Sequence, residues 1–359
     1  MPQGYAISDT KKWTDFKVID FDLKPEADDD VTVAIQFCGI CGSDLHTISG
    51  GWGELSVKSV IPGHEIVGKV TQVGKNVKDI KVGDRVGVGA QVGSCMNCSS
   101  CNTNFENYCL GDGKAGCVDT YNSKYADGHP AQGGYSTAIR AHQRFVFPIP
   151  DGITSEDAAS MFCAGLTVYS PLLRNGCGPG KNVAVVGLGG LGHYAVLFAA
   201  AMGANVTVIS HSPKKKEDAL KMGAKEFVAT GENEQWYADY GLKKEPFDII
   251  INTASSNALD LTALLKTCAV YGNIVMCGMP EDAWKVRSQH LAGNGAGVQG
   301  SHIGSKEDVK KMLALAAEKN IKPWIEVLDM KECPSAIQRV HDNDIRYRFV
   351  LKQDLEPVA

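Results

Sequence analysis

The sequence has no long hydrophobic run and no excess of positive charge. No stretch approaches the roughly 20 apolar residues of a membrane span, and Met1 to Trp13 lack an apolar run of signal-peptide length. The net charge of −5 gives no general attraction to nucleic acid or to anionic membranes. Internal repeats and low-complexity segments are also lacking. We therefore expect a cytoplasmic protein that binds neither nucleic acid nor membrane.

The composition indicates two globular domains. At 359 residues the chain exceeds the size of one typical hydrophobic core, and 44% hydrophobic with 21% charged residues is ordinary for a folded protein. Twelve cysteines could form disulfides in a secreted protein, but four of them lie between positions 95 and 109 beside glycines. That crowding favours metal binding in a reducing compartment.

The chain changes character near Pro150. Before it, short β-branched runs separated by turn residues predict a β-rich domain, at 31–37, 66–73 and 85–88. After it, strand-like and helix-like segments alternate from 182 to 277, which predicts a doubly wound parallel sheet. We expect domains at 1–152 and 153–300 and a C-terminal segment at 301–359. In that segment, Ser305 is a start signal for a helix at 306–319, and 348–351 is a last strand.

Four cysteines have the spacing C-x2-C-x2-C-x7-C: Cys95, Cys98, Cys101 and Cys109. Four thiolates on one short loop can close a tetrahedral Zn²⁺ site with no open position, which is typical of structural zinc. An iron–sulfur cluster or unligated thiols are the alternatives. Iron–sulfur runs have different spacing and a following proline, so we favour zinc.

A glycine-rich turn lies between a predicted strand and a predicted helix. It has the dinucleotide-binding pattern G-x-G-x-x-G, formed by Gly187, Leu188, Gly189, Gly190, Leu191 and Gly192. The glycines allow a tight turn and a close approach of the backbone to a pyrophosphate at the helix N-terminus. The alternative is a glycine-rich turn without a ligand.

The end of the next predicted strand lacks the carboxylate that NAD-specific folds place there. The segment instead contains Ser210, His211, Ser212, Lys214 and Lys215. Hydroxyls and cations suit the 2′-phosphate of NADP, so we predict NADP(H) as the cofactor. The alternative is that the lysines only decorate a helix start.

Other cysteine, histidine and glutamate residues are scattered, and spacing alone does not assemble them. The stretch Gly63-His64-Glu65-x2-Gly68-x5-Gly74-x2-Val77, followed by Gly83-Asp84-Arg85-Val86, resembles the zinc-containing alcohol dehydrogenases of the medium-chain dehydrogenase/reductase superfamily. The resemblance covers essentially the whole chain. The stretches 165–171 and 344–349 are similar to the cinnamyl-alcohol-dehydrogenase branch, particularly its fungal NADP-dependent members.

This resemblance implies a GroES-like catalytic domain and a Rossmann cofactor domain. It also implies a catalytic zinc held by Cys41, His64 and Cys163, with water, substrate or Glu65 in the fourth position. Together with the four-cysteine loop, the chain would hold two zinc ions. Asp44 would orient the zinc histidine, and Ser43 and His46 would relay a proton. On residue type alone, Ser43 is a turn residue and His46 a surface histidine.

Further cofactor contacts also rest on the resemblance. They are Thr167, Thr253, Gly278, Ser301, His302, Ile303 and Arg348, the last as a phosphate partner. Trp52 would wall the substrate pocket or serve as a structural tryptophan. The family further suggests a homodimer built through the cofactor domains.

The expected activity is the NADP(H)-dependent interconversion of aldehydes and primary alcohols. Substrates would include aromatic aldehydes such as cinnamaldehyde or benzaldehyde and medium-chain aliphatic ones. One alternative is a polyol or secondary-alcohol dehydrogenase on the same scaffold. Another is a non-catalytic NADPH-binding protein, although such proteins commonly lose zinc ligands and all eight candidates are present here.

Overall fold

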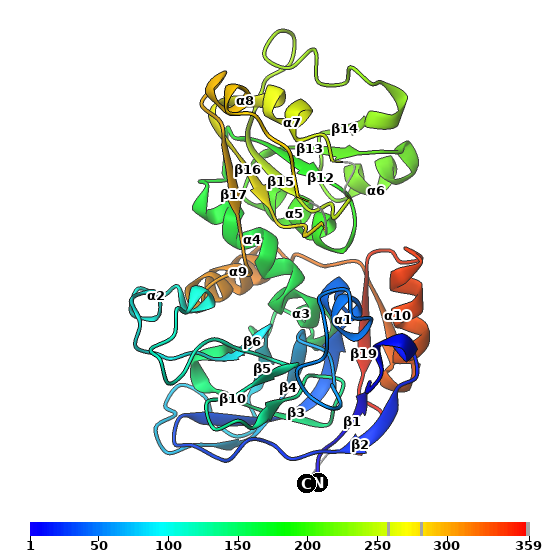
Figure 1. Cartoon of the computed structure of the whole chain (residues 1–359). Coiled ribbons are helices and arrows are strands. Elements are labelled where there is room, and N and C mark those ends of the chain that lie inside the picture. The colour runs from blue at the N-terminus through cyan, green and yellow to red at the C-terminus, as the bar shows by residue number, and fades with distance from the viewer. Residues whose placement is uncertain (257–258, 281–282, 357–359) are drawn as a thin grey trace. The chain divides into compact units, whose positions relative to one another are not determined.

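The chain is divided into two compact units (Figure 1). The computed structural model describes residues 1–256, 259–280 and 283–356, so the last three residues of the predicted C-terminal segment, 357–359, lie outside the described residues. Unit 1 contains Met1–Ala164 and Ser305–Ala359, and unit 2 contains Gly165–Gly304. The first break thus lies at Ala164 rather than after residue 152.

Unit 1 is built on a mostly antiparallel seven-stranded sheet with the order β11-β5-β4-β3-β19-β18, in which β10 also pairs with β3. Its strands are β3 (Asp30–Gly39), β4 (Ile66–Val73), β5 (Arg85–Val88), β10 (Ala138–His142), β11 (Val146–Pro148), β18 (Ile325–Asp329) and β19 (Arg348–Lys352). Because β19 pairs with β3, the end of the chain completes the sheet that its beginning started.

Smaller elements surround this sheet. The remaining strands of unit 1 are β1 (Gln3–Ala6), β2 (Lys17–Asp20), β6 (Gln91–Gly93), β7 (Val118–Asp119), β8 (Ser123–Lys124) and β9 (Pro130–Ala131). Its helices are α1 (Gly42–Ile48), α2 (Ser99–Asn102), α3 (Ser155–Ala159), α9 (Lys306–Glu318) and α10 (Cys333–His341). Single 3₁₀ turns are η1 (Thr10–Lys12), η2 (Glu106–Tyr108), η3 (Gln143–Phe145), η4 (Ser160–Phe162) and η7 (Met330–Glu332).

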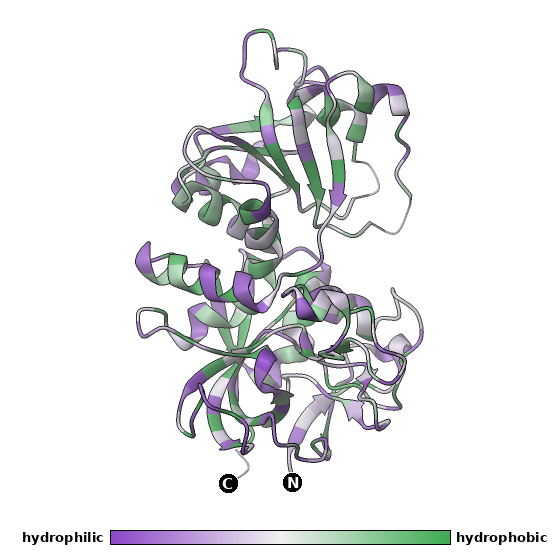
Figure 2. Ribbon diagram, turned by 90° about the vertical axis from the view of Figure 1, so that its left-hand side faces the viewer, coloured by the Kyte–Doolittle hydropathy of each residue, from purple (hydrophilic) through white to green (hydrophobic). Residues whose placement is uncertain are grey.

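The core of unit 1 lies on the strands of the large sheet. Val31, Val33 and Ile66 are fully buried, and Phe349 of β19 joins the same cluster. Figure 2 shows hydrophobic segments along the strands of this unit, between polar ones. Apolar residues alternating along half-buried strands explain why the sequence forms this sheet.

Unit 2 has a six-stranded parallel sheet with the order β14-β13-β12-β15-β16-β17. Its strands are β12 (Asn182–Val186), β13 (Asn205–Ser210), β14 (Glu226–Ala229), β15 (Phe247–Asn252), β16 (Cys268–Met276) and β17 (Gly297–Gly300). The order reverses between β12 and β15, which is the switch point where doubly wound folds bind ligands. The predicted Rossmann sheet is therefore confirmed.

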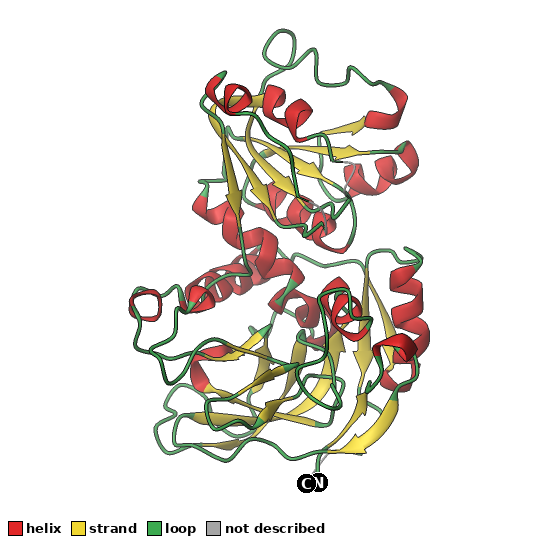
Figure 3. Ribbon diagram, in the orientation of Figure 1, coloured by secondary structure: helices red, strands yellow, loops and turns green. Residues whose placement is uncertain are grey.

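Helices connect the parallel strands (Figure 3). They are α5 (Gly190–Ala201), α6 (Lys216–Lys221), α7 (Leu261–Thr267) and α8 (Ser288–Ala292), with 3₁₀ turns η5 (Pro213–Lys215) and η6 (Thr230–Glu232). Helix α4 (Ala164–Arg174) precedes the first of these strands, and its first residue is the last residue of the first part of unit 1. Among the described residues, every helix is too short or too polar to reach across a lipid bilayer.

Candidate metal and cofactor sites

Four potential metal ligands come together in unit 1 from distant parts of the sequence. Cys41 follows β3 at the start of α1, His64 and Glu65 immediately precede β4, and Cys163 lies between η4 and α4. One ligand atom from each residue lies within 4.8 Å of the others, and all four residues are buried. The structure therefore assembles the predicted set, which spacing alone did not.

The distances in this cluster suit a small cation. The sulfur of Cys41 lies 4.0 Å from that of Cys163, and His64 Nε2 lies 3.1 Å from the Cys163 sulfur. Two thiolates, an imidazole and a carboxylate form a donor set that Zn²⁺ accepts readily. The residues present fit a catalytic zinc ion.

Asp44 fixes the orientation of His64. Its Oδ1 lies 3.1 Å from His64 Nδ1, so the imidazole N–H is directed to the carboxylate and Nε2 faces the two cysteines. Asp44 is completely buried and also accepts hydrogen bonds from the backbone N–H groups of Cys41 and Gly63 and from the Tyr135 hydroxyl. This is the partner arrangement expected behind a metal-binding histidine.

The cluster is also prepared electrostatically for a cation. A hydrogen bond from Cys163 and a further one from His64 hold the pKa of Cys41 well below its usual value. The same pairing, together with burial, raises the pKa of Cys163. Burial opposes charge on His64, but the Asp44 carboxylate raises the pKa of this imidazole. Because metal ligands bind as thiolate and neutral imidazole, a cation bound here would release protons from these groups.

Glu65 is paired with Arg348 rather than exposed to solvent. The Arg348 guanidinium donates to Glu65 Oε1, which also accepts from the backbone N–H of Ala164 at 3.3 Å. Glu65 Oε2 is buried without a hydrogen-bond partner in the described part of the chain, which fits an oxygen kept ready for a cation. Burial raises the pKa of Glu65 to about 7, although Arg348 opposes the shift.

Arg348, predicted as a phosphate partner, is paired with Glu65 beside the first metal cluster. Its side chain is 5% exposed within unit 1 and its partner there is a carboxylate. The structure gives this residue a role beside the metal ligands, and its contact with the cofactor stays a prediction.

Ser43 and His46 lie on α1, one turn apart, directly after Cys41. The Ser43 hydroxyl lies 3.6 Å from the Cys41 sulfur. The His46 ring stacks on Trp52, with ring centroids 5.1 Å apart and an angle of 11° between the planes. Trp52 is 51% exposed, so the stacked pair lies at the surface of unit 1.

The four cysteines of the short loop also converge. Cys95, Cys98, Cys101 and Cys109 have their sulfurs within 4.8 Å of one another. Backbone N–H groups point at the sulfurs: that of Cys98 at Cys95, that of Cys95 at Cys109, and that of Leu110 at Cys98, over 3.3 to 3.4 Å. Such N–H donors stabilise thiolates around a metal, so this loop fits a closed structural zinc site.

The glycine turn of unit 2 leaves room for a ligand. Gly187 has a φ of +85°, and a Cβ on Gly192 would lie 2.0 Å from the Gly187 oxygen, so neither position accepts a side chain. A Cβ on Gly189 would meet nothing within 4 Å. Helix α5, which begins at Gly190, has no side-chain cap, so its first N–H groups remain available to a pyrophosphate.

The other predicted cofactor residues gather at one edge of the parallel sheet. Gly187 follows β12, Ser210 ends β13, Thr253 follows β15 and Ser301 follows β17, with Gly278 close after β16. The carboxyl ends of parallel strands meet at the same edge, which is where doubly wound sheets bind ligands. Thr253 is tied to the glycine turn because its hydroxyl donates to the Val186 and Gly187 oxygens at 2.9 and 2.8 Å.

The remaining predicted contacts surround this edge. His302 and Ile303 follow Ser301, Thr167 lies on α4, and the Thr167 carbonyl accepts from the Cys277 thiol. Leu188 and Leu191 belong to the glycine turn and the first turn of α5, and His211, Ser212 and Lys214 follow β13. All these contacts stay predictions.

Lys215 reaches across to the glycine turn. Its Nζ donates to the Leu188 oxygen at 2.8 Å. Lys214 and Lys215 lie in the 3₁₀ turn η5, just before α6. The first turn of α6 itself carries Glu217 and Asp218. The lysines thus lie at a helix start, and Lys215 also places a cation beside the dinucleotide turn, while their contact with a 2′-phosphate stays a prediction.

Two side chains beside the first metal cluster, Tyr121 and Tyr135, were not predicted from the sequence, and Arg348 was predicted only as a phosphate partner. Tyr135 donates to Asp44, the Tyr121 ring lies 5.6 Å from that of His64, and Arg348 pairs with Glu65. Each is far from its partner along the chain and carries no local motif. Only the tertiary fold brings them together.

Comparison with known proteins agrees with this architecture. Residues 27–151 match the family described as alcohol dehydrogenase GroES-like domain, and residues 190–318 match the family described as zinc-binding dehydrogenase. An NADP-dependent alcohol dehydrogenase of Saccharomyces cerevisiae is 43% identical over 353 residues, which cover 97% of this chain and 96% of the relative.

Two solved structures extend the likeness to the fold. A cinnamyl alcohol dehydrogenase from Sorghum bicolor is 38% identical with a TM-score of 0.90 over the full length of both chains. One from Helicobacter pylori, solved with NADP(H), is 34% identical with a TM-score of 0.87 over 98% of this chain and 97% of the other. The protein belongs to the zinc-containing alcohol dehydrogenases of the medium-chain dehydrogenase/reductase superfamily and is of the cinnamyl-alcohol-dehydrogenase type.

Proposed function

We propose that this protein interconverts aldehydes and primary alcohols with NADP(H), acting on aromatic and medium-chain aliphatic substrates. The observation that carries the proposal is the convergence of Cys41, His64 and Cys163. A Zn²⁺ ion held there supplies a Lewis acid toward the oxygen of an aldehyde or alcohol. The relatives named above as NADP-dependent and cinnamyl alcohol dehydrogenases support this chemistry.

The chain's own residues supply the proton. Reduction of an aldehyde takes up one proton in addition to the hydride, and α1 offers a path for it. The Ser43 hydroxyl, beside Cys41, passes the proton on, and His46 exchanges it with water. Trp52 holds the His46 ring by stacking and walls the substrate pocket.

NADP(H) is preferred because of the segment after β13. Ser210, Ser212 and Lys215 supply hydroxyls and a cation next to the glycine turn, and no carboxylate is available for a ribose 2′-hydroxyl. Since NADPH is normally kept reduced in cells, aldehyde reduction is the favoured direction.

We further propose a homodimer formed through unit 2. Strand β17 is the last strand of the parallel sheet, and the neighbouring β16 carries Val270 and Tyr271, which are 72% and 79% exposed. An unpaired edge beside large apolar side chains favours pairing with a second copy. None of the twelve cysteines, all within the described residues, forms a disulfide, which fits a cytoplasmic location.

The test combines metal analysis with a panel of substrates. We expect two zinc ions per chain and turnover of cinnamaldehyde and benzaldehyde with NADPH. Sorbitol and 2-propanol serve as oxidation substrates in the same assay. Preference for these alcohols would favour the polyol or secondary-alcohol alternative, and binding of NADPH without turnover of any substrate would favour the non-catalytic one.

A further inference from the structure

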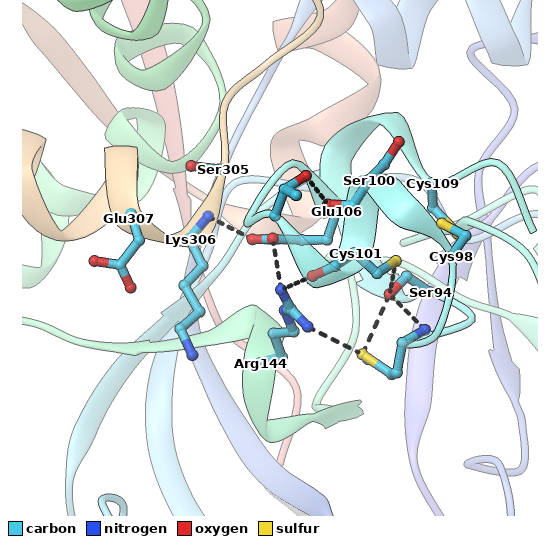
Figure 4. Close-up of polar contacts among 12 residues, drawn as sticks. Ser94, Cys98, Ser100, Cys101, Glu106, Cys109, Arg144, Ser305, Lys306 and Glu307 are labelled. Carbon is cyan, nitrogen blue, oxygen red and sulfur yellow. Dashed lines mark hydrogen bonds and ion pairs between the residues drawn. The ribbon is translucent and has the colours of Figure 1, made fainter.

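The four-cysteine loop is joined to helix α9 by one buried carboxylate. Glu106 lies between Cys101 and Cys109 of the loop and is 2% exposed. Its Oε1 accepts a hydrogen bond of 2.6 Å from the backbone N–H of Lys306, and its Oε2 lies 3.0 Å from Arg144 Nη2 (Figure 4). The two oxygens therefore have different partners, one on the helix and one on the body of unit 1.

The contact with Lys306 completes the cap of α9. Ser305 caps this helix by accepting from the Asp308 N–H, and Asp308 accepts from the Ser305 N–H in return. The Lys306 N–H belongs to the first helical residue and has no acceptor within the helix. Glu106 supplies that acceptor and places a negative charge at the positive end of the helix.

Arg144 connects the same carboxylate to the backbone of the loop. Its Nη2 donates to the Cys101 oxygen at 2.6 Å as well as to Glu106. Arg144 itself lies in η3, between strands β10 and β11 of the main sheet. Arg144 therefore links both the backbone at Cys101 and the carboxylate that caps α9 to the main sheet.

The loop has little apolar burial of its own. Phe105, Tyr108 and Leu110 are exposed, and α2 and η2 are only single turns. Such a loop depends on its metal for a defined conformation. Since Glu106 is part of the loop, its position against Lys306 depends on the metal as well.

We propose that Glu106 and Arg144 are positioning residues that couple occupancy of the four-cysteine metal site to the first turn of helix α9. When the site is loaded, Glu106 is held against the Lys306 N–H and the turn is closed. When the metal leaves, the loop loosens, Glu106 withdraws, and the first turn of α9 opens more often. This coupling is independent of the proposed substrate and direction of reaction.

Amide hydrogen exchange at Lys306 in the full-length protein measures the coupling directly. In the native protein we expect chelation of the metal to accelerate this exchange about tenfold, as expected for loss of a hydrogen bond to a charged acceptor. In Glu106→Gln the exchange is expected to be fast with metal bound, and chelation should add nothing further. If Glu106 and Arg144 formed only a structural ion pair, Glu106→Gln would accelerate Lys306 exchange by the same factor with and without metal.

Two controls separate this coupling from general effects. Glu307→Gln removes a half-exposed carboxylate from the same turn, where Glu307 pairs with the Lys310 side chain, and should behave as the native protein does. Cys41→Ala prevents loading of the other cluster only, and should leave Lys306 exchange slow. If Glu106→Gln does not take up metal, Arg144→Lys is measured in the same two states, with the same loss of metal dependence expected.

Two results would overturn the proposal. One is native-like exchange at Lys306 in metal-loaded Glu106→Gln or Arg144→Lys. The other is an equal acceleration by chelation in the native protein and in the variants.

Discussion

Arg348 donates to Glu65 across 283 positions of sequence, and both side chains are buried beside the ligands of the first metal cluster. The pair joins the last strand of the chain, β19, to the residue that precedes β4. A buried carboxylate needs such a cation because burial alone would force it to be protonated. This relationship leads to two predictions.

Replacing Arg348 by Met should destabilise the protein strongly. Removal of one partner leaves the Glu65 carboxylate buried without its counter-ion, at a cost of about 3 to 5 kcal/mol in the free energy of unfolding. Chemical denaturation measures the change. Lys75→Met is the control, since Lys75 pairs with Asp28 on the surface and its loss should cost about 1 kcal/mol or less. An equal loss of unfolding free energy in the two variants would show that the buried Glu65 pair stabilises the protein no more than a surface pair does.

Glu65 should also make the metal-free protein sensitive to pH. Its pKa is raised from 4.5 to about 7, so between these values the folded protein binds more protons than the unfolded chain. Stability from this group is therefore fully present below pH 4.5 and is lost as the pH rises toward 7. The free energy of unfolding of the metal-free native protein, minus that of Glu65→Gln, should fall over this interval. A difference that grows with pH would contradict the raised pKa.

Much of the fold could be predicted from the sequence because its signals are local. The strand at 66–73 and the capping serine before α9 appear as the patterns indicated, and the glycine turn lies between β12 and α5. The four-cysteine site could be predicted equally well, because its ligands are close in sequence. Cys41, His64 and Cys163 were grouped only through the family resemblance. Glu65–Arg348, Asp44–Tyr135 and Glu106–Lys306 depend on tertiary packing and left no trace in any short pattern.

Lys215 should govern the choice between the two nicotinamide cofactors. Its Nζ lies at the glycine turn, where the ammonium can meet a 2′-phosphate that NADH lacks. In Lys215→Ala we expect the ratio of kcat/KM for NADPH to that for NADH to fall about tenfold or more. Lys216→Ala is the matched control, because Lys216 is exposed at the start of α6. An unchanged ratio in Lys215→Ala would remove this residue from phosphate recognition.

Ser43 should be needed for the transfer of protons but not for binding of the metal. We expect Ser43→Ala to lower kcat for aldehyde reduction about 100-fold, with zinc content and NADPH affinity unchanged. Ser49→Ala is a suitable control, since Ser49 lies at the end of the same helix and its hydroxyl contacts the His46 backbone oxygen. Native kcat in Ser43→Ala would show that the proton takes another path.

Asp44 should set the affinity of the first cluster for its metal. The carboxylate orients His64 and balances the charge of the site, so Asp44→Asn should weaken zinc binding about 10- to 100-fold. Competition with a chromogenic chelator measures the affinity in the native protein and the variant. Tyr135→Phe removes one hydrogen bond to Asp44 but keeps its charge and the contact with His64, and should have a much smaller effect. Asp44 is bonded to Cys41, Gly63, His64 and Tyr135, which all lie outside the four-cysteine loop, so the zinc of that loop should remain bound in both variants. Loss of both ions together from Asp44→Asn would mean that the substitution unfolds unit 1 rather than disturbing one histidine.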